Sequence, residues 1–367
     1  MNKWQGDDLH LDSEIQKIDG CNKLWNLIVS ERESGKSTLI FKKIYNTFKD
    51  KKRPSIYVVR YQQDMTETFI EGAETIISKF TEQDVKLKYR KGDLKDGGIV
   101  DIRISVDGQE QEGTFFRLIA LSTKVGRLKS KVLINPRYIF YDEFIVNKRM
   151  KEKYLQDEPF QILEGVYNTY LRYVEKKDLN IYLFGNPYSV VNPFQSYLKI
   201  DANKIYPGSF IVGDSYAMWN YQIKPELKAK LLEGNKAYQF DDAYRRYAYD
   251  GRAVQDINIR LIKNIPENFR LEYVFKIHGK FIGIYHGYAR LPEGRLFYYA
   301  RIMKQEEIGS RRDVICFDFG EMADKTVLFH SGQKQFYYAF CEAVTRRQIA
   351  FASAEEGWIV EEIYQEL

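Results

Sequence analysis

The chain has 367 residues, of which 44% are hydrophobic and 29% charged, and a net charge of +5. This length and composition are typical of a soluble globular protein with two domains, and no apolar run is long enough to span a membrane. The start of the chain has no signal-peptide character, and three cysteines without metal-site spacing suit a reducing cytoplasm. With four histidines, the chain has little material for a histidine metal site or triad. The mild positive charge permits a polyanionic partner without requiring one.

An apolar stretch over residues 24–29 is followed by a polar turn and the start of a helix. We expect an ATP-binding phosphate loop made of Ser30, Glu31, Arg32, Glu33, Ser34, Gly35, Lys36, Ser37 and Thr38. Backbone N–H groups and the helix N-terminus would hold phosphate oxygens, Lys36 would reach the β- and γ-phosphates, and Ser37 would hold Mg²⁺. Gly35 allows close approach of the backbone, because it has no Cβ. Ser30 stands where the usual first glycine would be, so a chance Gly-Lys-Ser at a helix start is the alternative.

Helix and strand patterns alternate after the loop. A helix is expected at 39–48, a strand at 55–61 and a second helix at 64–80, where apolar residues recur at helical spacing. Alternating segments at 98–106 and 114–121 predict two further strands, separated by an Asp-Gly turn. At least one strand therefore lies, in sequence, between the loop and the second motif.

The second motif is a buried-strand pattern at 138–141 that ends in Asp142 and Glu143. Asp142 would belong to the coordination shell of Mg²⁺, and Glu143 would polarise the attacking water. An Asp-Glu pair facing solvent is common in isolation, but the two motifs together predict an NTPase that hydrolyses its nucleotide. The intervening strand and the adjacent glutamate fit an α/β P-loop ATPase of the additional-strand, catalytic-glutamate type. Such ATPases have a mostly parallel central sheet, and ring-shaped motors dominate among them.

A further helix at 159–175 precedes a strand at 180–186. This strand ends in Asn186, at the place where such ATPases keep a sensor of the γ-phosphate. Asn186 is therefore a candidate catalytic residue. The alternative is an ordinary turn residue, because Pro187 follows it directly.

Three domains are expected: an ATPase domain at 1–198, an irregular and helical linker at 199–255, and a small α+β domain at 256–367. The linker contains a proline-started helix at 225–232. Alternating strands with short glycine-bearing connections predict a meander in the last domain. Its strands are expected at 271–277, 281–287, 295–301, 314–319 and 326–329.

Three signatures carry a resemblance to a known family: Arg32 in a loop without its first glycine, Phe-Tyr-Asp-Glu-Phe-Ile at 140–145, and the segment 185–194. Together they resemble the DNA-packaging ATPase, or encapsidation protein, of small tailed bacteriophages with protein-primed genomes, a compact relative of the large terminases. The match is specific over about 24–195 and architectural beyond, where the family carries an RNase H-like domain. The resemblance implies a pentameric homo-oligomeric ring in the host cytoplasm, docked on the portal of an empty procapsid. There ATP hydrolysis would drive double-stranded DNA inward.

The resemblance also implies residues that act across subunits. Arg172 falls where the family keeps an arginine finger, whose guanidinium would neutralise charge on the γ-phosphate of the neighbouring subunit. Lys129 matches a second basic residue acting in trans, and Arg149 is the reserve candidate for the finger. For Arg172 and Lys129 the alternative is a solvated charge on a helix or loop.

Contact with DNA should be electrostatic and independent of base sequence, because a packaging motor must move any sequence. A basic run with one aromatic residue is expected on a loop that could line the pore; as the alternative, it is a solvated turn. It consists of Lys86, Lys88, Tyr89, Arg90 and Lys91. Arg245 and Arg246 in the linker are a second candidate.

Large terminases also cut DNA through carboxylates that hold two metal ions. Here the first strand of the last domain offers only Glu272, and no two-metal cluster can be assembled with the later acids Asp313, Asp318, Glu321 and Asp324. We therefore expect a vestigial, non-cutting domain that binds DNA, portal or a structural RNA. The competing functions are a nuclease-competent terminase subunit and a nucleotide-switched assembly or secretion factor that moves no DNA.

Overall fold

A computed structural model describes the chain in two compact units, one mainly of residues before 255 and one mainly of residues from 255 onward. The described residues are 11, 14–90, 94, 98–123, 134–147, 152, 154–155, 159–172, 174, 178–188, 192–201, 204–224, 260–277, 279–291, 294–308, 313–317, 326–346, 348–353, 356–357, 359–360, 363–364 and 367. Within them, no helix is long and apolar enough to cross a membrane.

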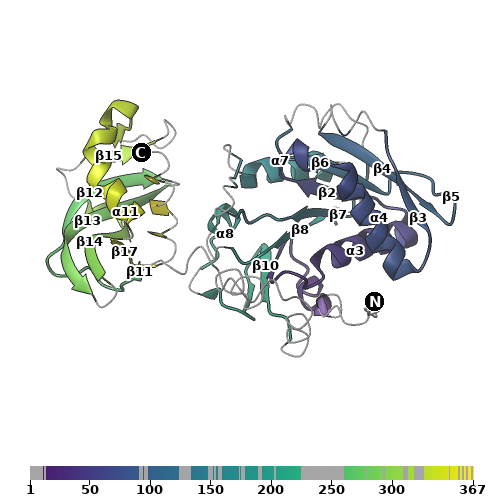
Figure 1. The fold of residues 1–367 in the computed structure, drawn as a ribbon, viewed down its shortest axis with the longest axis horizontal. Coiled ribbons are helices and arrows are strands. Elements are labelled where there is room, and N and C mark those ends of the chain that lie inside the picture. The colour runs from purple at the N-terminus through teal and green to yellow at the C-terminus, as the bar shows by residue number, and fades with distance from the viewer. Residues whose placement is uncertain are drawn as a thin grey trace. The chain divides into compact units, whose positions relative to one another are not determined.

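In its described residues, the larger unit is built on a ten-stranded sheet in the order β3-β4-β6-β2-β7-β8-β1-β10-β9, with β5 paired to β4 (Figure 1). Its strands are β1 Trp25–Ser30, β2 Ser55–Val59, β3 Val85–Lys88, β4 Ile99–Val106, β5 Gln109–Glu110, β6 Phe116–Ala120, β7 Tyr138–Asp142, β8 Asn180–Gly185, β9 Phe210–Val212 and β10 Tyr216–Tyr221. From β6 to β10 all neighbours run parallel, while β3, β4, β5 and β9 are antiparallel. The expected mostly parallel sheet is confirmed.

Local sequence explains these elements. Every residue of β1, β2 and β6 is buried, as is typical of strands covered on both faces. Asp107 and Gly108 both have positive φ in the turn between β4 and β5, a conformation that Asp-Gly adopts readily.

Helices pack beside the sheet, and their described members are α2 Gln16–Asp19, α3 Lys36–Lys51, α4 Glu67–Thr81, α7 Pro159–Leu171 and α8 Pro193–Tyr197. The Thr66 side chain accepts a hydrogen bond from the Phe69 N–H and so caps α4. The apolar stripe of α4 that includes Ile70, Ala73 and Ile77 is buried, and α4 packs against α3 (Figure 1). The helices expected after the loop and at 64–80 are confirmed.

The expected helical linker at 199–255 is wrong in its described part. Residues 210–212 and 216–221 form β9 and β10, and β10 pairs in parallel with the whole of β1, from Trp25 opposite Tyr216 to Ser30 opposite Tyr221. Aromatic residues in this segment favour a strand, and burial on both faces removes the alternation that would have revealed it. The sheet of the larger unit therefore continues past residue 198. The helix expected at 225–232 lies outside the described residues.

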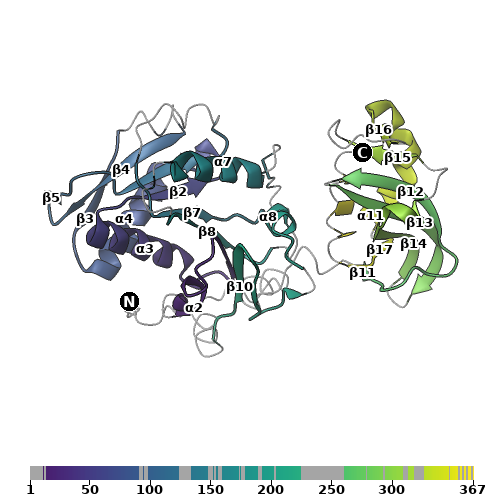
Figure 2. The same ribbon diagram turned by 180° about the vertical axis from the view of Figure 1, so that it is seen from behind.

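The described part of the smaller unit forms a seven-stranded sheet in the order β11-β17-β14-β13-β12-β15-β16 (Figure 2). Its strands are β11 Arg260–Leu261, β12 Arg270–Ile277, β13 Lys280–Leu291, β14 Gly294–Met303, β15 Val314–Cys316, β16 Thr326–Leu328 and β17 Ile349–Phe351. β12, β13 and β14 form the expected antiparallel meander, and β15 then pairs in parallel with β12. Helix α11, Tyr338–Thr345, packs Phe340 into the core against Phe275 and Tyr298.

Candidate nucleotide site

The expected phosphate loop lies between the carboxyl end of β1 and the first turn of α3. Gly35 caps α3 with a φ of 91°, a left-handed conformation that glycine adopts without steric cost. The hydroxyls of Ser30 and Ser34 lie 2.7 Å apart and close the turn. Ser30, which replaces the usual first glycine, thus contributes a side-chain contact to the loop. The first N–H groups and the positive end of the long helix α3 meet this turn, which suits it to bind an anion.

Lys36 connects this loop to the end of β8. Its Nζ donates to the carbonyl oxygens of Ser30, at 3.1 Å, and Glu31, at 2.8 Å, and to Oδ1 of Asn186 at 2.9 Å. The structure therefore brings Asn186 to the loop, although its role as a γ-phosphate sensor stays a prediction. Burial lowers the pKa of Lys36 to about 8, and this is opposed mainly by the negative charges of Asp142, Glu31 and Glu143.

The pKa of Lys36 predicts that phosphate binding weakens in alkaline solution. Lys36 loses its charge as pH rises through about 8, whereas bound phosphates would hold the proton on it. The affinity for ADP in EDTA should fall about fivefold from pH 8 to pH 9, measured by calorimetry. Lys36→Arg stays charged throughout, so its affinity should be flat over this range. A flat wild-type profile would contradict the link to Lys36.

Asp142, at the end of β7, is held through both carboxylate oxygens. The Tyr57 hydroxyl donates to Oδ2 at 3.1 Å, and the Glu143 N–H donates to Oδ1 at 3.0 Å. Burial raises the pKa of Asp142, and Lys36, Tyr57 and the Glu143 N–H oppose the rise. Burial and the Asp142 charge raise the pKa of Tyr57, so its phenol stays protonated and donates.

The donor set at this edge of the sheet fits Mg²⁺. It combines the Asp142 carboxylate with the Ser37 hydroxyl on the first turn of α3, and Mg²⁺ is commonly bound by one or two carboxylates together with substrate phosphates. No cluster of three or more His, Cys, Asp or Glu side chains suited to a metal occurs among the described residues.

Glu143 follows Asp142 with a φ of 57°, a left-handed conformation that is uncommon for glutamate. Arg60, buried just after β2, donates to the Glu143 carbonyl oxygen and pairs with Glu152 at 3.3 Å. This contact holds the backbone on which the Glu143 side chain is mounted. The Glu143 side chain is open to solvent, yet the surrounding protein partly desolvates the carboxylate. This desolvation, with the negative charges of Asp142 and Glu152, raises the pKa of Glu143.

Sequence reasoning missed Tyr57, Arg60 and Tyr188 as parts of this site. Tyr188 accepts a hydrogen bond from Nη2 of Arg32 at 3.1 Å, and so joins the loop to the chain after β8. For Arg60 the available signal was a charged residue at the carboxyl end of an otherwise apolar strand, as in residues 55–61, whereas Tyr57 lies in the middle of β2 and has no such signal. In parallel sheets these ends meet at one edge.

The residues expected to act across subunits are only partly described. Arg172 is exposed directly after α7, while the neighbouring Tyr170 is buried and accepts a hydrogen bond from Arg117 at 3.0 Å. The end of α7 is therefore anchored while Arg172 points into solvent. Lys129 and Arg149 lie outside the described residues.

The basic run does not lie on a loop as expected, because residues 85–88 form β3. Its alternating apolar residues, Val85 and Leu87, are buried, and this two-residue period places Lys86 and Lys88 on the exposed face. Lys86 lies 3.6 Å from Glu74, and Lys88 lies 2.8 Å from Glu110. Arg90 is exposed and Tyr89 half-buried after the strand. The role of the run in DNA contact stays a prediction; Lys91, Arg245 and Arg246 lie outside the described residues.

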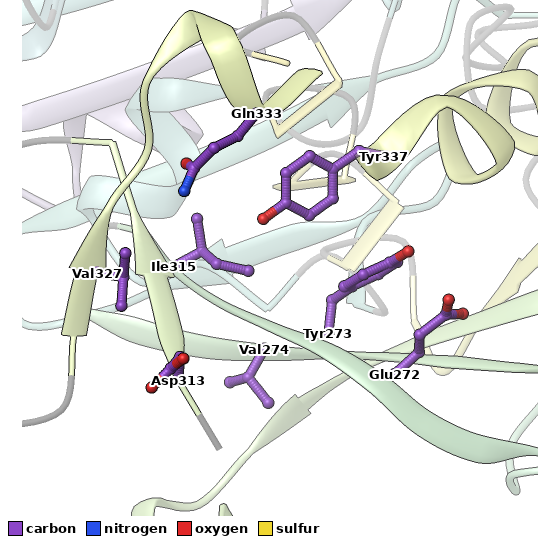
Figure 3. Close-up of a pocket in the computed structure, with 8 residues that line it drawn as sticks. All are labelled: Glu272, Tyr273, Val274, Asp313, Ile315, Val327, Gln333 and Tyr337. Atoms are coloured by element: carbon purple, nitrogen blue, oxygen red, sulfur yellow. The ribbon is translucent and has the colours of Figure 1, made fainter. Parts of the chain in front are cut away.

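The smaller unit contains a cavity of about 360 Å³ at the β12–β15 side of its sheet (Figure 3). Glu272 and Asp313 line it together with Tyr273, Val274 and Tyr337, and the two carboxylates lie on opposite sides of Val274. They form no metal-binding group with another described acid. The further candidates Asp318, Glu321 and Asp324 lie outside the described residues.

Across nearly its whole length the chain has the fold of bacteriophage DNA-packaging motor proteins. One solved structure, the Phi-28 gp11 DNA packaging motor, aligns over 96% of this chain and 96% of its own, with a TM-score of 0.61 and 17% identity. A chain of the bacteriophage Phi-29 viral genome packaging motor assembly aligns over 96% and 98%, with a TM-score of 0.65 and 18% identity. The resemblance inferred from the sequence is confirmed at the level of the fold. No protein-family model matches the chain, and no curated protein matches it.

Proposed function

We propose that this protein is an ATP-driven translocase that packages double-stranded viral DNA into an empty procapsid through the portal vertex. The observation that carries the proposal is the meeting of Lys36, Asn186, Asp142 and Glu143 at one edge of a parallel sheet. Ligands of open parallel sheets bind at the carboxyl ends of strands. The site has the parts that ATP hydrolysis needs: an anion-binding turn, a basic side chain, a metal-binding carboxylate and a candidate base.

The ATPase is proposed to be of the P-loop, additional-strand, catalytic-glutamate type. In support, β8 is inserted between the loop strand β1 and the Asp142 strand β7. Lys36 and the loop N–H groups would bind the phosphates of ATP, and Ser37 with Asp142 would hold Mg²⁺, which neutralises phosphate charge when bound. Glu143 would take a proton from the attacking water. Burial and the Asp142 charge raise its pKa, which makes it a better base than an ordinary glutamate.

The smaller unit is proposed to be an RNase H-like domain without nuclease activity. Its meander β12–β14, continued by the parallel strands β15 and β16 beside β12, supports this relation. Glu272 and Asp313 lie on opposite sides of Val274, which is unsuited to a shared two-metal cluster. Such a domain would bind DNA, the portal or a structural RNA. A nuclease-competent terminase subunit would require metal-dependent cleavage that is lost on changing Asp318.

The working form is proposed to be a homo-pentameric ring in the host cytoplasm, docked on the portal of the procapsid. Arg172 is exposed at the anchored end of α7, where it could reach a neighbouring subunit. Lys86, Lys88, Arg90 and Lys91 are proposed to contact the DNA backbone. Exposed ion pairs such as Lys88–Glu110 cost little to exchange for phosphate contacts.

DNA-stimulated ATP hydrolysis tests the proposal directly. The ATPase rate with procapsids should rise on addition of double-stranded DNA, to the same extent for unrelated base sequences and less at high salt. Lys36→Ala should abolish the rate in both conditions. An ATPase rate that DNA does not change, measured with procapsids present, would favour the competing nucleotide-switched assembly or secretion factor.

A further inference from the structure

Tyr57 lies on β2, the strand next to β7, opposite Phe140 in the parallel register. Since side chains alternate between the faces of a strand, Asp142 lies on the same face as Phe140, two residues further along β7. The long tyrosine side chain crosses this interval diagonally, and its hydroxyl lies 3.1 Å from Oδ2 of Asp142. The two residues are 85 positions apart in the sequence, and only the sheet brings them together.

Aromatic packing fixes the ring of Tyr57. Phe41 of α3 stacks on it at 5.7 Å between centroids, Phe69 of α4 meets it edge-on at 4.9 Å, and Phe116 of β6 lies at 6.4 Å. Tyr57 is 3% exposed. These contacts hold the ring from two helices and a strand, so the direction of its hydroxyl is set by the core and not by solvent.

We propose that Tyr57 is a positioning residue that orients the Asp142 carboxylate for Mg²⁺, an inference that rests on the proposed ATPase function. The Tyr57 hydroxyl and the Glu143 N–H each donate to a different oxygen of Asp142, and together they fix the plane of the carboxylate. Mg²⁺ demands near-octahedral geometry, so a carboxylate free to rotate is a poorer ligand. Partners that orient metal ligands affect metal affinity about 10–100-fold.

The test measures metal binding without turnover. Binding of Mn²⁺ in the presence of a non-hydrolysable ATP analogue is followed by electron paramagnetic resonance for the wild type and Tyr57→Phe. Phenylalanine keeps the aromatic packing and removes only the hydroxyl. We expect the Kd for Mn²⁺ to rise about tenfold or more, while the affinity for the analogue in EDTA stays unchanged. The Mg²⁺ concentration for half-maximal ATPase should rise by the same factor, with the rate at saturating Mg²⁺ within about twofold of the wild type.

Tyr182→Phe is the matched control. Tyr182 is a buried tyrosine of the same sheet, and its hydroxyl donates to a different carboxylate, Asp19, at 2.6 Å. Its Mn²⁺ affinity should equal that of the wild type. A Tyr57→Phe protein with unchanged Mn²⁺ affinity, or a Tyr182→Phe protein with an equal loss, would overturn the inference about Tyr57.

A second variant tests the proposal independently of whether Tyr57→Phe folds. Introducing 4-aminophenylalanine in place of Tyr57 keeps an N–H donor at the same position, and it should retain metal affinity close to that of the wild type. Loss of affinity in this folded variant overturns the proposal. If the wild type neither binds the analogue nor hydrolyses ATP, the proposed function itself is refuted. This outcome differs from one in which only the inference about Tyr57 fails.

Discussion

Glu143→Gln is expected to lower ATP turnover by at least about 100-fold, because an amide cannot accept the proton of the attacking water. Shape and backbone contacts are retained, since Arg60 binds the carbonyl oxygen of residue 143 and not its side chain. Nucleotide binding should therefore persist. The measurements are steady-state phosphate release and equilibrium binding of a fluorescent ATP analogue.

Glu82→Gln is the matched control for this prediction. Glu82 is an exposed glutamate with the same backbone φ of 57°, at the end of α4. Its substitution should leave turnover unchanged. Hydrolysis by Glu143→Gln within about twofold of the wild-type rate would place the base elsewhere, because general-base catalysis is worth far more than that.

Arg172→Ala is expected to lower turnover by about 10³-fold in the assembled oligomer, the usual worth of an arginine finger. Mixing it with Glu143→Gln should restore activity, since each protein supplies the residue that the other lacks. In a random equimolar ring about a quarter of the sites would combine an intact Glu143 with an intact neighbouring Arg172, so recovery to roughly a quarter of the wild-type rate is expected. Phosphate release is measured on the mixed assemblies with DNA present.

The control for the second prediction is Arg346→Ala. Arg346 is an exposed arginine at the end of α11, as Arg172 is at the end of α7, and its ion pair with Glu342 is exposed. Exposed pairs contribute little, so this protein should hydrolyse ATP normally. Full activity of Arg172→Ala in a verified oligomer would show that the finger lies elsewhere. No recovery in the mixture would argue against a site shared between subunits.

Short-range features of the site were predictable from the sequence. Gly35 before Lys36 predicts a tight turn opening a helix, and the structure has that turn, because a left-handed residue and a helix start depend on adjacent positions. An apolar strand that ends in Asp142 and Glu143 likewise predicts carboxylates at the edge of a sheet, because the strand and its acidic end are contiguous in the sequence. The roles assigned to Arg172 and Asn186 stay predictions, although the structure places Asn186 against Lys36.

The missed or misplaced features share another cause. The sequence predicts a helical linker over residues 216–221, because a strand buried on both faces shows no alternation and its partner β1 lies almost two hundred positions earlier. The sequence predicts a loop for the basic run, because its charged residues dominate the pattern. Val85 and Leu87 become a strand only when β4 pairs with them.

By itself the sequence determined the strand–turn–helix of the phosphate loop, the Asp142-Glu143 strand end and the meander of the smaller unit, since each follows from contiguous residues. Only the tertiary structure decided which distant groups meet. Lys36 and Asn186 are 150 positions apart, and Tyr57 and Asp142 are 85. Such contacts depend on the order of strands in the sheet, in which β8 lies between β1 and β7 and β2 lies beside β7. That order is set by how whole strands and helices bury their apolar faces together, a property that no local stretch of residues contains.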